Sequence, residues 1–395
     1  MLVDLSPIPI SPNERKILSK IEQVSAESGS HSPSIATIQL TIPEIEVDID
    51  ACYLSNPLAT DLFWSHFNAD LLADPDHFKS MLEAYPSQNR AIAERLSGSL
   101  GIDSNRLFIT NGATEAIQAV LHNYTSHIHI SIPTFSPYYE FAVDGTQVTK
   151  YELDPANNFA VDPNDYVRSV LQSNADTAVL ISPNNPDGYV IPDSDLDFIL
   201  SKLKGLKTII VDESFIHFSD RPTPNDQLPS LAGITEKYDN ITIVKSMSKD
   251  FGIAGIRAGY AIMNPERVTQ LLNHGYLWNT SGIAEYFFGL FDRPEFLIEY
   301  RQKLATYKTY IDKFTQTTSA FDFVQPFQTS ANFQLMQMPT GISAEVVAGL
   351  LLVRHGIYAR SCGDKIGLNG QFLRVAIRTE SENTKILSAL KEVLS

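Results

Sequence analysis

The chain of 395 residues carries thirty Lys and Arg against forty-six Asp and Glu, a formal net charge of −16. This acidic balance, without a stretch that concentrates Lys or Arg, argues against a nucleic-acid partner. Residues 1–12 contain Asp4 and three prolines instead of a basic end before an apolar run, and no apolar segment has transmembrane length. We therefore expect no secretory signal and no membrane partner. Cys52 and Cys362 lack metal-like spacing and suit a reducing, cytoplasmic location, so no metal site is expected.

The N-terminal segment is predicted to be an extension and linker over residues 1–35. Residues 13–27 have helical spacing, and residues 25–34 are rich in serine.

From about residue 76 the chain alternates helical segments with short apolar runs. The predicted strands are Arg106–Thr110, His127–Ile132, Thr177–Ser182, Thr208–Asp212, Ile241–Ser246 and Arg257–Ile262. The predicted helices between them include Thr114–Asn123, Asp162–Ser173 and Asp193–Lys204. Nearly uninterrupted apolar strands that alternate with helices predict an α/β fold with a mainly parallel sheet, covered on both faces. We assign residues 76–285 to this large domain.

A second, smaller α+β domain is predicted from residues 36–75 together with 286–395. Helical periodicity continues to about Ser319, strands follow at Asn332–Met338 and Phe372–Ile377, and a helix begins near Glu382. Residues 47–56, which end in the turn Asn56-Pro57, are expected to join this domain.

Three strand ends of the large domain carry groups that could bind a ligand, because ligands bind beyond the carboxyl ends of the strands in open α/β sheets. In residues 110–116, Gly112 permits a tight turn, and the amides of Ala113 and Thr114 face a potential anion. Thr114 could equally cap the helix. In residues 181–188, Asn185 could donate to a ligand oxygen or belong to an Asn-Pro turn. Asp212 ends an apolar strand and needs a cationic or proton-donating partner.

The fourth strand end, residues 244–260, is more specific. Lys249 at a strand end can be desolvated, which makes its amine a nucleophile toward a carbonyl. Ser246 and Ser248 supply hydroxyls, and Arg257 follows across a Gly-rich turn. An amine, two hydroxyls and a guanidinium describe a site for an aldehyde phosphate.

Spaced in this order, the four segments resemble the fold-type I enzymes that use pyridoxal 5'-phosphate (PLP), specifically the class I/II aminotransferases, from about Val47 onward. The resemblance is greatest to histidinol-phosphate aminotransferases and to threonine-phosphate decarboxylases. It implies that Lys249 is the Schiff-base lysine and Asp212 the carboxylate that keeps the pyridine nitrogen protonated. Further roles are implied for Asn185 at the phenolic oxygen and Phe135 on the ring face. The implied phosphate cup consists of Gly112, Ala113, Thr114, Ser246, Ser248 and Arg257.

The resemblance also implies substrate and partner contacts. Tyr85 resembles the tyrosine that reaches the phosphate of the neighbouring subunit, which predicts a homodimer. Arg374 matches the arginine that binds the substrate α-carboxylate, and Arg360 is the candidate for a distal phosphate or acid, or else an exposed charge. The two arginines are expected at opposite ends of a cleft. Asn56 is a further substrate-binding candidate.

The predicted activity is that of an aminotransferase, which moves an amino group between an amino acid and a 2-oxo acid. The alternative is a decarboxylase of a phosphorylated amino acid. Phe215 stands where most aminotransferases of this group have tyrosine, and threonine-phosphate decarboxylases often have Phe there, which weakens the aminotransferase interpretation. A cofactor-sensing transcription regulator would need an added DNA-binding domain, for which about 35 N-terminal residues are too few. A nicotinamide-dependent oxidoreductase would need a glycine fingerprint that residues 252–259 do not match.

Overall fold

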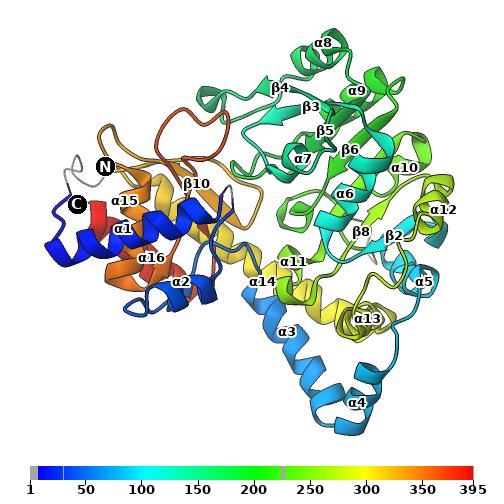
Figure 1. Ribbon diagram of the computed structural model, residues 1–395, viewed down its shortest axis with the longest axis horizontal. Coiled ribbons are helices and arrows are strands. Elements are labelled where there is room, and N and C mark those ends of the chain that lie inside the picture. The colour runs from blue at the N-terminus through cyan, green and yellow to red at the C-terminus, as the bar shows by residue number, and fades with distance from the viewer. Residues whose placement is uncertain (1–7, 30, 224–226, 395) are drawn as a thin grey trace. The chain divides into compact units, whose positions relative to one another are not determined.

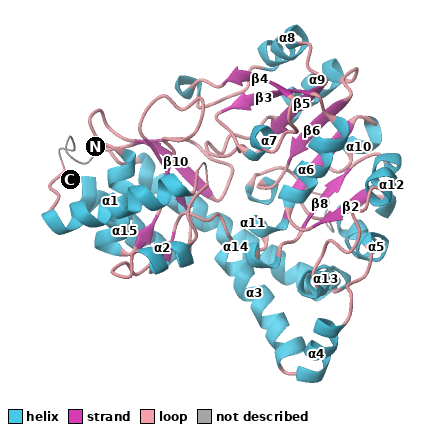
Figure 2. Cartoon of the chain, in the orientation of Figure 1, coloured by secondary structure: helices cyan, strands magenta, loops and turns pink. Residues whose placement is uncertain are grey.

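The computed structural model describes residues 8–29, 31–223 and 227–394, which form two compact units (Figures 1 and 2). Unit 1 comprises residues up to 54, residues 186–188 and residues from 308 onward, and unit 2 comprises residues 55–185 and 189–307. Helix α14 (Pro294–Ser319) runs through the boundary between residues 307 and 308. Within the described ranges, no helix is both long enough and apolar enough to cross a membrane.

Unit 2 is built on a seven-stranded sheet. Its strands, in spatial order, are β2 (Leu107–Thr110), β8 (Gly259–Ile262), β7 (Ile241–Ser246), β6 (Thr208–Asp212), β5 (Thr177–Ile181), β3 (His127–Ile132) and β4 (Gln147–Glu152). The neighbours from β7 through β4 pair in parallel, whereas β8 is antiparallel to both β2 and β7. The predicted α/β class and mainly parallel sheet are confirmed. Strand β4 was not predicted, because its alternating polar sequence follows the partial exposure of a sheet edge instead of an apolar run.

Most helices of unit 2 lie around this sheet, whereas α3 (Pro57–Phe67) and α4 (Pro75–Glu83) extend away from it (Figure 2). The others are α5 (Asn89–Leu100), α6 (Ala113–Tyr124), α7 (Pro137–Glu140), α8 (Pro163–Ser173), α9 (Asp193–Leu203), α10 (Ile234–Lys237), α11 (Met247–Asp250), α12 (Pro265–Asn273) and α13 (Gly282–Gly289). Apolar side chains of α6 such as Ile117 and Val120 are fully buried against Ile130, Ile210 and Val244 of the central strands. Burial of this apolar surface anchors the first turn of α6 at the edge of the sheet.

Unit 1 contains a four-stranded sheet in the order β12 (Arg360–Ser361), β13 (Phe372–Ala376), β10 (Phe333–Gln337) and β9 (Gln325–Pro326). Strands β1 (Ile49–Asp50) and β11 (Ile357–Tyr358) form a separate parallel pair. Its helices, besides the end of α14, are α1 (Pro12–Glu27), α2 (Ile35–Thr41), α15 (Ala344–His355) and α16 (Glu380–Leu394).

The N-terminal residues are part of the core of unit 1. Ile17, Val24 and Ile38 share one buried cluster with Leu352 and Tyr358. Helix α1 begins with a capping box, in which Ser11 and Glu14 satisfy each other's backbone N–H groups. Where α1 meets α15, Gly349 leaves the space that Leu18 fills: a Cβ on Gly349 would lie 2.2 Å from a Leu18 methyl group.

These boundaries differ from the predicted ones. Residues 1–35 were expected to be an extension and linker outside both domains, but those of them that the structure describes belong to unit 1 and contribute Ile17 and Val24 to its core. Residues 55–75 and 286–307 were assigned to the small domain and instead belong to unit 2. For residues 294–307 the cause is that α14 is one continuous helix, so the helical periodicity shows no break where the chain passes from one unit to the next.

Strand β8 approaches the start of α6 so closely that Gly259 has no room for a side chain. A Cβ on Gly259 would lie 2.6 Å from the carbonyl carbon of Gly112 and 2.7 Å from the nitrogen of Ala113. We predict that Gly259→Ala lowers the free energy of unfolding by about 1–3 kcal/mol, the usual cost of overpacking, because backbone must move. Denaturant titration measures the change. Gly255→Ala is the matched control, since its Cβ would meet nothing within 4 Å, and equal effects of the two substitutions would contradict this explanation.

Candidate active site

The four strand ends identified in the sequence meet at one edge of the sheet of unit 2. Asp212 pairs with Ile181 on one side and with Val244 on the other. Gly259 lies between Ser246 and Thr110. The strand register therefore gathers the four segments into one site.

The first turn of α6 forms one side of this site. Helix α6 has Gly112 at its N-cap with φ 79°, a left-handed conformation that favours glycine, and no side chain caps its amides. The possibility that Thr114 caps the helix is thereby excluded. A Cβ on Gly112 would lie 2.3 Å from Nη2 of Arg257, and Nη2 donates to the carbonyl oxygen of Asn111 at 3.4 Å. The guanidinium and the uncapped amides therefore face the same place, as an anion site requires.

Two serine hydroxyls extend this arrangement. The Oγ of Ser246 accepts a hydrogen bond from the N–H of Ser248 at 3.3 Å, and both side chains are buried. The Oγ of Ser248 has no hydrogen-bond partner among the described residues. A buried hydroxyl without a partner is costly unless a ligand supplies one. The hydroxyl, the guanidinium and the amides of α6 therefore fit a phosphate group.

Asp212 has the partner that its position requires. Its carboxylate is 3 % exposed and accepts hydrogen bonds from the hydroxyl of Tyr138 and the N–H of Ser214, both at 2.8 Å. Burial raises the pKa of Asp212, and the two hydrogen bonds oppose that shift by favouring the charged form. A protonated pyridine nitrogen would add a positive charge at this carboxylate, so the site fits the ring of PLP.

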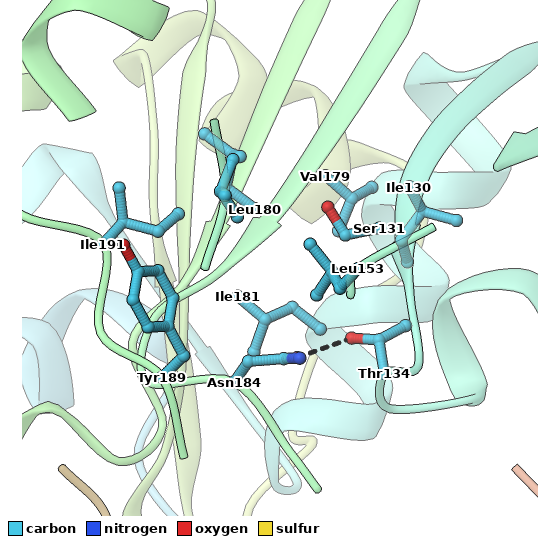
Figure 3. Close-up of a pocket in the computed structure, with 11 residues that line it drawn as sticks. Ile130, Ser131, Thr134, Leu153, Val179, Leu180, Ile181, Asn184, Tyr189 and Ile191 are labelled. Carbon is cyan, nitrogen blue, oxygen red and sulfur yellow. Dashed lines mark hydrogen bonds between the residues drawn. The ribbon is translucent and has the colours of Figure 1, made fainter. Parts of the chain in front are cut away.

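A hydrogen-bond network couples two loops beside Asp212. The hydroxyl of Thr134 donates to Oδ1 of Asn184 at 2.8 Å, and the amide of Asn184 donates to the carbonyl of Pro133 at 3.0 Å. Figure 3 shows Thr134 and Asn184 pointing toward each other. Phe135 and Asn185 follow these residues directly and are half-buried and buried. The adjacent cavity, of about 10 Å³, is large enough for one water molecule only.

Lys249 lies on α11 and is half-buried. Its carbonyl accepts from the backbone N–H of Asn56 at 3.0 Å, and the Asn56 amide donates to the carbonyl of Asp250 at 3.2 Å. The Oδ1 of Asn56 accepts the first amides of α3, and the residue is fully buried. The prediction that Asn56 contacts substrate is therefore corrected, because both ends of its side chain already hold α3 and α11.

Unit 1 carries the two arginines predicted to bind substrate. Arg360 and Arg374 are direct partners on β12 and β13, so they lie side by side and not at opposite ends of a cleft. Arg374 is 8 % exposed, donates to the carbonyl of Cys52 at 2.9 Å and lies over the ring of Phe333. Arg360 donates to Asp364 at 2.6 Å. The expectation of separated guanidiniums failed because an antiparallel register cannot be read from the residues of one strand.

Tyr85 lies apart from this network in unit 2. It is 86 % exposed, and its ring centroid is 5.8 Å from that of Trp278, which is 53 % exposed. This exposure leaves the tyrosine accessible to a second copy of the chain.

The sequence analysis missed Tyr138 and Asn184. The need of Asp212 for a proton donor was a signal for Tyr138, but the sequence offered no means of choosing between Tyr138 and Tyr139. Asn184 was not predicted because the resemblance assigns a role only to the next residue, Asn185. The described residues contain no cluster of three or more His, Cys, Asp or Glu side chains suited to hold a metal ion.

Comparison with known proteins shows what this chain is similar to. An L-serine phosphate decarboxylase from Campylobacter jejuni is 43 % identical over 98 % of this chain and 99 % of its own length. A second, from Sulfurospirillum multivorans, is 39 % identical over 93 % of both chains. The solved structure of a decarboxylase from S. multivorans superposes with a TM-score of 0.91, at 38 % identity and 97 % coverage of each chain. Histidinol-phosphate aminotransferase from Clostridium acetobutylicum gives 0.76, at 28 % identity over 87 % of this chain and 98 % of its own.

The family model for class I and II aminotransferases matches residues 71–390. That range contains every residue of the phosphate cup, together with Lys249 and Asp212. The resemblance inferred from the four strand ends is confirmed. The cofactor of this protein is PLP. The chain belongs to the class I and II aminotransferase family.

Proposed function

We propose that this enzyme is a PLP-dependent decarboxylase of a small phosphorylated amino acid, with L-serine phosphate as the first substrate to test. The observation that carries the proposal is the similarity along almost the whole chain to two proteins named L-serine phosphate decarboxylase. This decarboxylase interpretation was the alternative to transamination in the sequence analysis, and it now has the stronger support.

The residues of the site suit this chemistry. PLP, when bound, withdraws electrons from the amino acid Cα, so that a bond to that carbon can break. In the proposed reaction the C–COO⁻ bond breaks, CO2 leaves, and a proton takes its place on Cα. Asp212, held by Tyr138 and Ser214, keeps the pyridine nitrogen protonated. Lys249 would hold the cofactor covalently, and its amine would carry the proton that replaces the carboxylate on Cα.

Two features support the substrate class. The pair Arg360 and Arg374 places two guanidiniums beside each other, which suits a substrate with a carboxylate and a second anionic group. Phe215, which is buried, supplies no hydroxyl to the site. As noted for the sequence, Phe at this position is frequent in threonine-phosphate decarboxylases, whereas most aminotransferases of the group have Tyr. We propose further that the enzyme is a homodimer in which the exposed Tyr85 reaches the cofactor phosphate of the partner subunit.

The function is tested by product analysis. Purified holoenzyme is incubated with L-serine phosphate, L-threonine phosphate or L-serine, and CO2, primary amine and keto acid are measured. We expect CO2 and amine in equal amounts without keto acid, and a preference for phosphorylated over neutral serine of roughly ten- to hundredfold, from one charge-assisted contact. Lys249→Ala is the inactive control. Keto acid formation in place of CO2 would establish the aminotransferase alternative instead.

Asp212 and Tyr138 allow a graded test of the pyridine contact. Asp212→Asn should retain PLP and lose nearly all turnover, because the amide cannot hold the ring nitrogen protonated. Tyr138→Phe removes one hydrogen bond to a charged group, worth about 1.5–3 kcal/mol, and should lower kcat by about ten- to hundredfold. Absorbance at the cofactor band measures PLP content, and steady-state kinetics measures kcat. Normal kcat in PLP-loaded Asp212→Asn protein would refute the assigned role.

Substitution of Arg360 tests whether this residue of β12 binds the distal phosphate of the substrate. Arg360→Ala should remove most of the preference for the phosphorylated substrate while slow turnover of neutral amino acids continues, as measured by the ratio of kcat/KM values. Arg354→Ala serves as the control, because that arginine pairs with Glu14 of α1 and has no assigned contact with substrate. If Arg360→Ala leaves the preference unchanged, Arg360 is a structural partner of Asp364.

A further inference from the structure

A buried ion pair lies directly beside the two residues that hold the cofactor. Lys245 and Asp250 are both fully buried and form an ion pair with each other. Lys245 is on β7, and Asp250 follows Lys249 at the end of α11. Neither side chain belongs to the phosphate cup or to the pyridine contact, so the pair has no role among those described above.

The Lys245 ammonium has a second partner. It donates to the carbonyl oxygen of Glu213 at 3.1 Å, and Glu213 follows Asp212 in the chain. One ammonium group therefore connects the residue after Asp212 with the residue after Lys249. The adjacent residues Asp212 and Lys249 are the ones proposed to hold PLP, Asp212 at the pyridine nitrogen and Lys249 at the aldehyde.

The surroundings keep this connection in one geometry. Nδ1 of His217 is 3.5 Å from Asp250 and 2.6 Å from the hydroxyl of Tyr300. Burial lowers the pKa of His217 well below its usual value, so the imidazole is neutral and adds no charge that competes with Lys245. Burial raises the pKa of Asp250 to about 6, against the Lys245 ammonium, so the carboxylate is ionised at neutral pH. The ring of Phe251 stacks on Tyr300, with centroids 4.2 Å apart.

A buried ion pair is an expensive way to stabilise a fold, because both charges lose their hydration. Apolar side chains of similar size would stabilise the same space at least as well. Such a pair does define a distance and a direction between the backbone segments that it joins, which apolar packing does less strictly.

We infer that Lys245 is a positioning residue: its ammonium, held between the carbonyl of Glu213 and the carboxylate of Asp250, sets the separation between Asp212 and Lys249. The inference rests on Lys249 and Asp212 as cofactor residues, and it does not depend on whether the reaction is decarboxylation or transamination.

The test measures how apoprotein captures PLP, a process that involves no amino acid substrate. Apoprotein is mixed with PLP, and the covalent link is followed by its absorbance and trapped with borohydride at successive times. We expect capture by Lys245→Met to be slowed by about 10²-fold, because a small displacement of reacting groups has effects of this size. Asp250→Asn should be affected less, since its amide oxygen can still accept from Lys245.

The double variant Lys245→Met/Asp250→Asn separates positioning from stability. It lacks both charges of the pair, so Asp250 is no longer left as a buried carboxylate without Lys245, and its unfolding midpoint should recover much of what Lys245→Met loses. Its PLP capture should remain slow, because the connection to Glu213 is still missing. Ile386→Ala, a core substitution on α16 of unit 1, is the control for lost stability alone and should capture PLP at the wild-type rate.

Two results would overturn the inference. One is wild-type capture by the double variant, which would show that the pair serves stability alone. The other is equally slow capture by Ile386→Ala, which would show that any loss of stability has the same effect. If Lys245→Met does not fold, the double variant and Asp250→Asn still decide between these outcomes.

Discussion

The site depends on a carboxylate that is kept out of water at the end of a strand. Asp212 is buried because β6 runs through the middle of the sheet, with paired strands on both sides. A carboxylate in that position must be compensated, and two hydrogen bonds do so from different directions. Tyr138 reaches it from α7 and Ser214 from the turn that follows β6. The loops around β6 are therefore constrained to supply hydrogen-bond donors to this carboxylate.

Much of the fold could be predicted from the sequence because the central strands are continuous apolar runs. The range predicted for β6 is the range found, and the range predicted for β7 is also the range found. Both are continuous apolar runs, which a parallel sheet with two covered faces requires. The edge strand β4 lacks that signal, and the boundary inside α14 has no signal at all, because a helix that crosses between units keeps its periodicity.

The sequence could predict those residues of the candidate site whose type alone suggests their role. The sequence singles out Lys249, Asp212 and Arg257 because few residue types could perform the roles proposed for them. Tyr138 and Lys245 were not found, because their importance comes from what they touch after folding. Lys245 is the clearest example: in the sequence it is a polar residue near the end of a strand, and in the structure it bonds to two segments about forty residues apart in the chain.

The contact between Leu18 and Gly349 has a consequence for how this protein can change. A side chain at position 349 would occupy the space that Leu18 now fills, so the two positions are coupled through shared volume. A relative that lacks α1 has no reason to keep glycine at that point of α15, and grafting α1 onto such a relative would bring Leu18 against a side chain. The N-terminal helix and the small residue that receives it are therefore expected to be gained or lost together.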